Sequence, residues 1–256
     1  MSRTYGQYCP LALAAELLCE RWTLLIVSRL IDGCSKFNEI HRGVPRISPS
    51  LLSQRLSELE REGLLVRRRS VNGANATTYE LTRAGRELAP LIDGLAVWGQ
   101  QWARDMTNDD LDPGFLAWSM HLQLDTERMP SGRTVLEFEF TGAPKDCTRF
   151  WLVNTDGKVD MCLKDPGFEI DLKVLADLRL FIEAWRGIRD LRAEIRARRI
   201  RVLGAPALCR ALPQWLKLST LAHYPRRTPG RELRLARTHA PRKASDALQI
   251  PPPKPL

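Results

Sequence analysis

Apolar residues recur three and four positions apart through the first third of the chain, which is the spacing of amphipathic helices. Residues 10–20 begin with a proline and predict one such helix. Residues 22–31 are almost entirely apolar and predict a second helix that is buried on most sides. Ser35 is expected to cap a short third helix, and a Gly-Val-Pro turn follows it at residues 43–45.

A longer helix and two strands come next. Ser48 is a typical N-cap residue, Pro49 suits the first helical position, and Gly63 ends the helix. The buried side of this helix is predicted by three leucines spaced at i, i+4 and i+7, namely Leu52, Leu56 and Leu59. Residues 64–69 and 78–81 predict two strands, which are joined by a turn rich in asparagine and glycine.

A short helix, a turn, a longer helix and a hairpin, in that order, predict a winged helix-turn-helix that binds duplex DNA. Such a fold places its second helix in the major groove, so the outward polar residues of that helix are candidate DNA contacts: Ser48, Ser50, Ser53, Gln54 and Ser57. Arg67 and Arg69 are candidate phosphate contacts from the hairpin, and Arg46 is a further basic candidate before the helix. An ordinary solvated helix would show the same polar face, but the neighbouring elements favour DNA binding.

The segment after the hairpin predicts a long helix with an apolar seam. Thr82 is the expected N-cap, and the helix is expected to run to about Asp105. The seam consists of apolar residues three and four positions apart, namely Leu88, Leu91, Leu95, Trp98 and Trp102. This spacing indicates a helix that packs against a long partner.

A domain boundary is predicted at residues 107–114, which are polar and rich in turn formers. Residues 115–224 predict a second domain of α+β class, in which strands come first and helices follow. Its expected strands are 135–140, 149–154, 158–163 and 200–203, and its expected helices are 175–185 and 207–218. Residues 225–256 are rich in proline and arginine and predict a disordered basic tail. The whole chain is therefore expected to be α+β, with its DNA-binding and dimerisation domain over residues 1–106.

The 256-residue chain has a net charge of +9, which is unevenly distributed. Residues 1–106 hold 14 basic and 11 acidic residues, residues 107–224 hold 17 of each, and the last 32 residues hold 8 and 2. A polyanionic partner is therefore expected at the two ends of the chain and not at its neutral middle.

Several classes of protein are not expected from this sequence. No apolar run is long enough for a transmembrane helix, and the N-terminus lacks the apolar core of a secretory signal, so no membrane partner is expected. The six cysteines show no paired spacing, which argues against a metal site or a disulfide framework and favours the cytoplasm. The four histidines are isolated and no catalytic or nucleotide-binding motif is present, so neither an enzyme nor a cofactor is expected.

Residues 8 to about 104 resemble the HxlR family of bacterial transcription regulators, which is related to MarR. The resemblance is carried by CPLALAAELLCERWTLLIVSRLIDGCSKFNEI, ISPSLLSQRLSELEREGLLVRR and YELTRAGRELAPLIDGLAVWG. It implies a homodimer on palindromic double-stranded DNA, built by the N-terminal helix and the helix after the hairpin. Some members use a cysteine before the first helix as a redox or electrophile sensor, which makes Cys9 a redox candidate. The alternative is a cysteine that merely packs.

Residues 117–220 resemble a sterol carrier protein domain, through VLEFEF, FWLVNTDGKVDMCLKDPGFEIDLKVLADLRLFIEAWRG and IRVLGAPALCRALPQWL. The resemblance implies an apolar groove between sheet and helices that would hold a hydrophobic small-molecule effector. The candidate lining residues are aromatic: Phe138, Phe140, Trp151, Phe168, Phe181, Trp185 and Trp215. The alternative is that these residues form plain core. Residues 189–201 depart from the pattern by their charge and would close or reshape the groove entrance.

The leading hypothesis is a dimeric, sequence-specific transcription regulator whose second domain responds to an effector. One rival hypothesis is a carrier of lipids or small hydrophobic molecules, in which the winged helix serves only dimerisation. Another is nonspecific DNA binding through the basic tail. The polar outward face of the longer helix favours the first hypothesis, because a helix used only for dimerisation would not need serine and glutamine beside basic residues.

Overall fold

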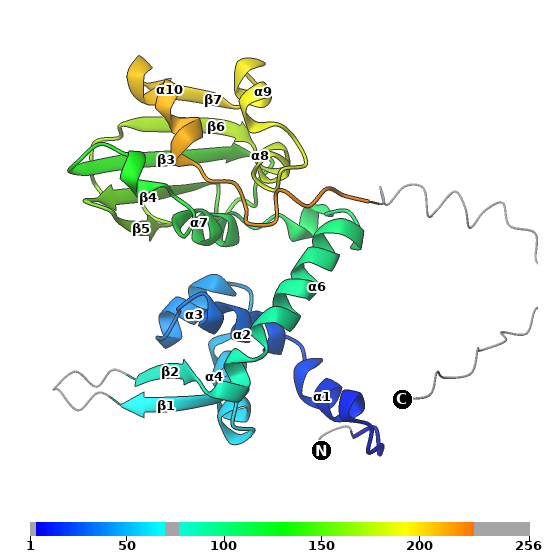
Figure 1. The fold of residues 1–256 in the computed structure, drawn as a ribbon. Helices are drawn as coiled ribbons and strands as arrows, with labels where there is room; N and C mark the ends of the chain where they lie inside the picture. The colour runs from blue at the N-terminus through cyan, green and yellow to red at the C-terminus, as the bar shows by residue number, and fades with distance from the viewer. Residues whose placement is uncertain (1–3, 70–76, 228–256) are drawn as a thin grey trace, which may run out of the picture.

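The computed structural model describes residues 4–69 and 77–227. Two bodies with separate hydrophobic cores are joined by one helix, α6, which runs from the first body to the second (Figure 1). The turn predicted within the hairpin and most of the predicted tail lie outside the described residues. The first body contains α1 (Pro10–Leu18), α2 (Thr23–Ile31), α3 (Phe37–Gly43), α4 (Pro49–Arg61), β1 (Leu65–Arg69), β2 (Thr77–Leu81), α5 (Arg83–Arg86) and α6 (Ala89–Trp102).

Local sequence signals set the boundaries of α4 as predicted. The Ser48 hydroxyl accepts a hydrogen bond from the Leu51 amide at 3.3 Å, and Pro49 occupies the first turn. Gly63 follows the helix with φ of 72°, a conformation that favours glycine. The three predicted leucines are buried, and they fix α4 on the core so that its opposite side faces solvent: Leu52, Leu56 and Leu59.

The cap of α3 differs from the prediction. Lys36, not Ser35, is the N-cap residue. The Glu39 carboxylate, at the third helical position, accepts from the Ser35 amide at 3.0 Å and from the Lys36 amide at 3.1 Å, which are the amides just before the helix. The Ser35 carbonyl instead accepts from the Tyr79 amide at 2.7 Å, which anchors β2 to the start of α3. The wing is therefore held directly against the helix-turn-helix.

The single helix expected from Thr82 to Asp105 is wrong, because two helices occupy this segment. Thr82 caps α5 by accepting from the Gly85 amide at 3.2 Å. Pro90 then stands in the first turn of α6, where its missing N–H and fixed φ suit a new start rather than continuation of α5. The second helix ends at Trp102, because Ala103 is extended with ψ of 160°.

The second body is a five-stranded sheet with helices, in the strand order β5-β4-β3-β6-β7. Strands β3 and β6 are parallel, and the other neighbours are antiparallel. Its elements are α7 (Pro113–His121), β3 (Arg133–Thr141), β4 (Arg149–Thr155), β5 (Lys158–Cys162), β6 (Leu172–Asp177), α8 (Leu178–Trp185), α9 (Leu191–Arg196), β7 (Arg201–Gly204) and α10 (Pro206–Trp215), with 3-10 turns at Asn108–Asp110 and Thr126–Arg128.

The prediction of one helix over residues 175–185 is wrong in its first part. Residues Leu172–Asp177 form the strand β6, in which Leu172 and Val174 point into the core at alternate positions. The Asp177 carboxylate then caps α8 by accepting from the Leu180 amide at 3.0 Å. The strand β6 and the helix α8 follow each other without a loop, so their apolar residues form one run. This run conceals the change from the two-residue alternation of a strand to the 3.6-residue repeat of a helix. The helices α7 and α9 were also not predicted.

The two bodies touch at α2, α3 and α7. The Arg29 guanidinium lies 4.1 Å from the centre of the Trp118 ring and forms an ion pair with Asp32 at 3.3 Å. Trp118 is buried, and Gly43 at the end of α3 lies directly against it. The first helix of the helix-turn-helix therefore rests on the second body.

The end of α6 is tied to the second body as well. The Gln100 side chain accepts from Arg186 Nη2 at 2.6 Å and donates to the Arg186 carbonyl at 3.2 Å. Arg226, at the start of the predicted tail, also holds this end of the helix by donating to the Gln100 and Ala103 carbonyls at 3.1 and 2.6 Å. Gln100 is buried although it lies on a helix that exposes much of its other surface. Hydrogen bonds therefore fix the end of α6 to the second body.

Substitution of Gly43 tests the contact between the bodies. Gly43→Ala is expected to lower the free energy of unfolding by about 1–3 kcal/mol. The added Cβ would lie 2.5 Å from Arg29 Cδ and 2.9 Å from Trp118 Cε2. The gain in helix propensity, about 1 kcal/mol at most, is smaller. Urea-induced unfolding measures the change, and it should shrink in a Trp118→Leu background. An equal cost in both backgrounds would contradict this account of the contact.

Candidate nucleic-acid interface

The predicted contact residues of α4 lie together on its solvent-exposed side: Ser48, Ser50, Ser53, Gln54 and Ser57. The Ser48 and Ser50 hydroxyls are 3.2 Å apart, at the N-terminal end of the helix. The Ser57 hydroxyl donates to the Ser53 carbonyl at 3.0 Å and accepts from Arg67 Nη2 at 3.3 Å. Small hydroxyl side chains on the first two turns allow close approach of a base edge or a phosphate.

Acidic residues occupy the other end of α4, and each has a basic partner. Glu58 pairs with Arg55 at 2.6 Å, and Arg55 also reaches Glu20 at 2.8 Å. Although burial acts in the opposite direction, hydrogen bonds from Gln54 and Arg55 hold the pKa of Glu58 below its ordinary value. Glu58 therefore stays ionised, and repulsion from phosphates favours insertion of the N-terminal half of α4 alone.

Arg67 is part of the joint between the wing and α4. Its Nη2 donates to the Ser57 hydroxyl at 3.3 Å, its Nε lies 3.5 Å from the Glu60 carboxylate, and its guanidinium lies 5.4 Å from the Tyr79 ring centre. The side chain is 31% exposed. Arg67 thus holds the wing against the helix, and part of its side chain remains exposed to solvent.

The next two arginines of the wing point to opposite faces. Arg68 donates to the Glu80 carboxylate at 2.7 Å. Arg69 is exposed and has no ion pair with any residue in the described parts of the chain. The register pairs Arg67 with Tyr79 and Arg69 with Thr77, so these two arginines share a face.

Arg46, a predicted DNA contact, is also held by residues of the segment between the bodies. Its Nε donates to the Asp112 carboxylate at 3.1 Å, and its Nη2 donates to the Leu111 carbonyl at 3.3 Å. Both acceptors belong to the segment between the bodies. The sequence places Arg46 two residues before the cap of α4, but only the tertiary structure shows that acidic residues of the linker hold it.

The aromatic residues predicted to line an effector pocket do not line one common cavity. Phe138 stacks on Phe150 with ring centres 4.9 Å apart and meets Phe181 edge to face at 5.8 Å. Phe140 and Trp185 belong to the same core. Trp151 lies on the opposite face of the sheet, beside Val135 and Val153. Trp215 also belongs to the main core, whereas Phe168 is exposed, so all members of the aromatic set except Phe168 match the alternative interpretation as core.

The cysteines differ in exposure. All six are free, Cys9 and Cys19 are exposed, and Cys9 is the N-cap residue of α1. Burial raises the pKa of the Cys34 thiol to about 11. Within the described residues, no group of three or more potential ligands gathers to hold a metal ion. No helix of residues 4–69 and 77–227 combines the length and apolar character needed to cross a bilayer.

Alkylation should follow this difference. With iodoacetamide at pH 8, Cys9 and Cys19 are expected to react well before Cys34, because burial raises the pKa of the Cys34 thiol and leaves little of the reactive thiolate. Peptide mass mapping over a time course measures the three rates. Equal rates for Cys34 and Cys9 would show that Cys34 is neither buried nor held as a thiol.

Comparison with known proteins bears on the first body. The model of the HxlR-like helix-turn-helix family matches residues 17–107. The uncharacterized HTH-type transcriptional regulator YvaP of Bacillus subtilis (strain 168) is 35% identical over 112 residues, which cover 43% of this chain and 96% of YvaP. The HTH-type transcriptional regulator YodB of the same organism is 34% identical over 95 residues, covering 37% of this chain and 85% of YodB.

A solved structure of YodB in its reduced form is 33% identical, with a TM-score of 0.34, and covers 38% of this chain and 95% of that one. The family model ends at residue 107, so it does not extend to the sheet of the second body. The match to YvaP spans nearly the whole of that protein at more than 30% identity. The chain therefore belongs to the HxlR-like helix-turn-helix family of transcriptional regulators.

Proposed function

We propose that this chain is a homodimeric, sequence-specific regulator that reads double-stranded operator DNA with the N-terminal half of α4. The observation that carries the proposal is the open outer face of α4, with its serines and Gln54 exposed beside the wing. Among the described residues, contacts from the second body and the linker reach α2, α3, Arg46 and the end of α6, and the outer face of α4 stays exposed. Family membership gives the same expectation independently.

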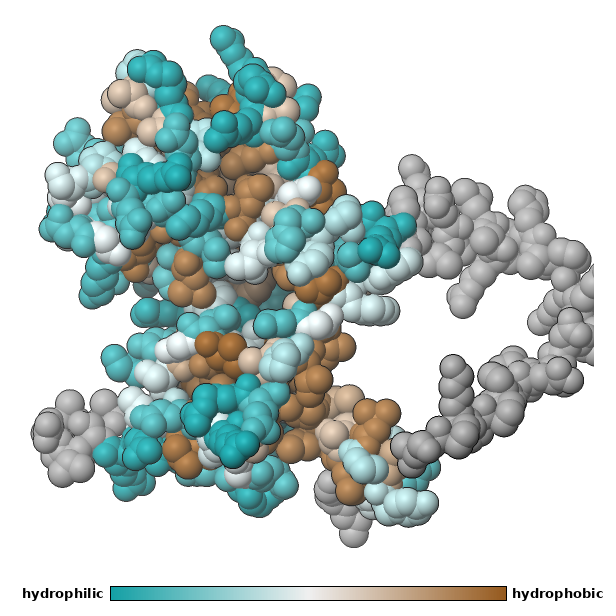
Figure 2. All heavy atoms as spheres, viewed as in Figure 1, coloured by the Kyte–Doolittle hydropathy of each residue, from teal (hydrophilic) through white to brown (hydrophobic). Residues whose placement is uncertain are grey.

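A dimer is supported by apolar surface on α1 and α6. The seam predicted on α6 is largely exposed: Leu91 (60%), Leu95 (54%), Trp98 (58%) and Trp102 (45%). Helix α1 adds Leu11 and Leu13, and Tyr8 before it is 96% exposed. Figure 2 shows apolar residues gathered along the course of α6 and over α1. Apolar surface of this extent marks an interaction site, and the self-complementary spacing fits a second copy.

We further propose that the chain divides into residues 1–106, a second domain over 115–224 and a basic tail over 225–256. The second domain would be a sterol-carrier-like module that responds to an effector. The five-stranded mixed sheet, with α7, α8 and α10 contributing to the core on one of its faces, supports that module. The bonds between Gln100 and Arg186 supply the route by which it would move α6 and the spacing of the two recognition helices. Cys9, being exposed, stays a candidate for redox control.

The experiment compares binding of the full chain to its selected operator and to a shuffled duplex, using fluorescence anisotropy at a fixed salt concentration. The proposal predicts an affinity ratio of about 10³ or more, as specific regulators show. Equal affinities for both duplexes would contradict it. That result would favour the alternative of a carrier for hydrophobic molecules whose winged helix serves only dimerisation.

A further inference from the structure

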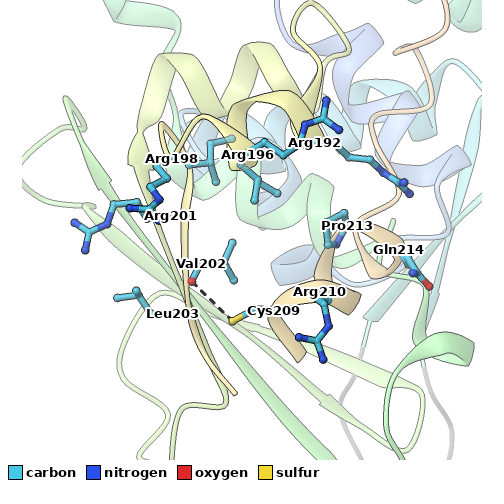
Figure 3. Close-up of a pocket in the computed structure, with 12 residues that line it drawn as sticks. Arg192, Arg196, Arg198, Arg201, Val202, Leu203, Cys209, Arg210, Pro213 and Gln214 are labelled. Atoms are coloured by element: carbon cyan, nitrogen blue, oxygen red, sulfur yellow. Dashed lines mark hydrogen bonds between the residues drawn. The ribbon is translucent and has the colours of Figure 1, made fainter. Parts of the chain in front are cut away.

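A groove on the second body lies away from α4 and the wing. It has a volume of about 630 Å³ and is formed by α9, β7 and α10 (Figure 3). Strand β7 is an edge of the sheet, and Cys209 Sγ of α10 approaches the Val202 carbonyl of β7 at 3.8 Å. This volume is within the range of small-molecule sites.

Five arginines surround this groove, and Figure 3 shows them distributed around it: Arg192, Arg196, Arg198, Arg201 and Arg210. None of the five has an ion pair with a residue in 4–69 or 77–227. Two nearby arginines outside the groove are paired, since Arg189 binds Glu183 at 2.6 Å and Arg199 binds Glu194. The carboxylates of Glu183 and Glu194 thus form ion pairs beside the groove and do not neutralise the arginines that line it. The result is a concentrated positive potential.

One of the five arginines stands where glycine would be favoured. Arg198 has φ of 57°, in the left-handed region, just after the end of α9. The Arg199 amide donates to the Glu194 carbonyl at 3.0 Å, so this turn is a helix-ending motif that usually holds glycine. Arginine is strained at this position. Arg198 lines the groove although its backbone is strained, which indicates that its positive charge contributes to binding there.

Apart from Cys209 and Gln214, the rest of the lining is apolar. It is provided by Ile195, Ile200, Val202, Leu203 and Pro213. Ile200 is buried and joins the groove to the main core. Guanidinium groups bind carboxylate and phosphate in two-pronged geometry, whereas an aliphatic surface favours an apolar chain.

We propose that this groove binds a small amphipathic anion, with an apolar chain on the aliphatic lining and a carboxylate or phosphate head held by the arginines. The inference deepens the proposed effector response, and its regulatory meaning rests on that proposed function. Binding itself does not depend on DNA. A nucleic-acid backbone is the other polyanion that arginines attract, but it would not need a concave apolar floor, and the segment 107–224 as a whole is neutral.

The test is calorimetric titration of the full chain, without DNA, with three probes: oleate below its micellar concentration, oleyl alcohol and inorganic phosphate. Oleate should bind at least about tenfold more tightly than the alcohol, which lacks the charge, and than phosphate, which lacks the chain. Arg198→Gly should raise the dissociation constant for oleate about tenfold, while its midpoint of thermal unfolding stays the same or rises. Arg210→Ala should also weaken oleate, and the exposed Arg83→Ala, distant from the groove, should leave it unchanged.

Equal binding of oleate and oleyl alcohol would overturn the proposal, as would unchanged oleate affinity in both Arg198→Gly and Arg210→Ala. If these variants instead weaken binding to the selected operator in the absence of oleate, the groove is a nucleic-acid surface and the proposal is wrong. If the full chain binds oleate but does not distinguish the operator from a shuffled duplex, the proposed ligand groove is supported. The proposed regulatory function is then refuted. The two failures are therefore distinguishable.

Discussion

A double substitution on α6, Leu95→Glu with Trp98→Glu, is expected to convert the dimer into a monomer and to lower operator affinity by about 10²- to 10⁴-fold. Both side chains are more than half exposed in one chain and lie on the same seam. A dimer would bury them against the same seam of a second copy, where four introduced carboxylates would lie close together without partners. Loss of the dimer uncouples the two recognition helices, so each half-site must be bound separately.

Light scattering coupled to size-exclusion chromatography measures the mass, and fluorescence anisotropy measures the affinity. Ile170→Glu is the matched control, because it also places a carboxylate at an exposed apolar position, before β6 and away from the seam. It should change neither quantity. A Leu95→Glu/Trp98→Glu variant that remained dimeric would show that α6 is not the dimer interface.

Gln54→Ala combined with Ser53→Ala is expected to weaken operator binding by about tenfold or more per half-site, with little change for a shuffled duplex. Both residues lie on the exposed N-terminal half of α4 and neither contributes to the core. The fold and the dimer should therefore be unaffected. Removal of base contacts reduces the ratio of specific to nonspecific affinity, whereas removal of a phosphate contact weakens both.

Arg61→Ala serves as the control on the same helix. Arg61 lies at the C-terminal end of α4, and its guanidinium pairs with the neighbouring Glu62 at 3.1 Å. It should affect the specific-to-nonspecific ratio far less than the change at Ser53 and Gln54. An unchanged ratio in the Ser53→Ala/Gln54→Ala variant would mean that α4 does not read bases.

Much of the first body could be predicted because short-range signals set it. The Ser48 cap, the stop at Gly63 and the leucine stripe of α4 are readable without tertiary information, and the structure shows all three. The apolar seam of α6 was likewise predicted from the spacing of its residues, and the structure leaves this seam largely exposed. What short-range reasoning missed there was the break at Pro90, which a run of apolar residues on both sides concealed.

The second body and the junction were less predictable because they depend on contacts between distant segments. Strand β6 reads as helix until its pairing with β3 is known, since its apolar run continues into α8. Arg46 contacts Asp112 and Gly43 lies against Trp118, and each partner is more than 60 residues away in the sequence. The structural roles of Arg46 and Gly43 therefore could not be predicted from their neighbours in the chain. The charge of residues 189–201 was recognised, but the groove that five arginines share was not visible before α9, β7 and α10 came together.

Selection from a random duplex pool shows whether two copies of α4 read DNA in successive grooves. The full chain should enrich an inverted repeat whose half-site centres are about 10 base pairs apart, one helical turn of about 34 Å. The Ser53→Ala/Gln54→Ala variant should lose that enrichment. Recovery of no preferred sequence, or of a single asymmetric site by a dimeric protein, would contradict the account.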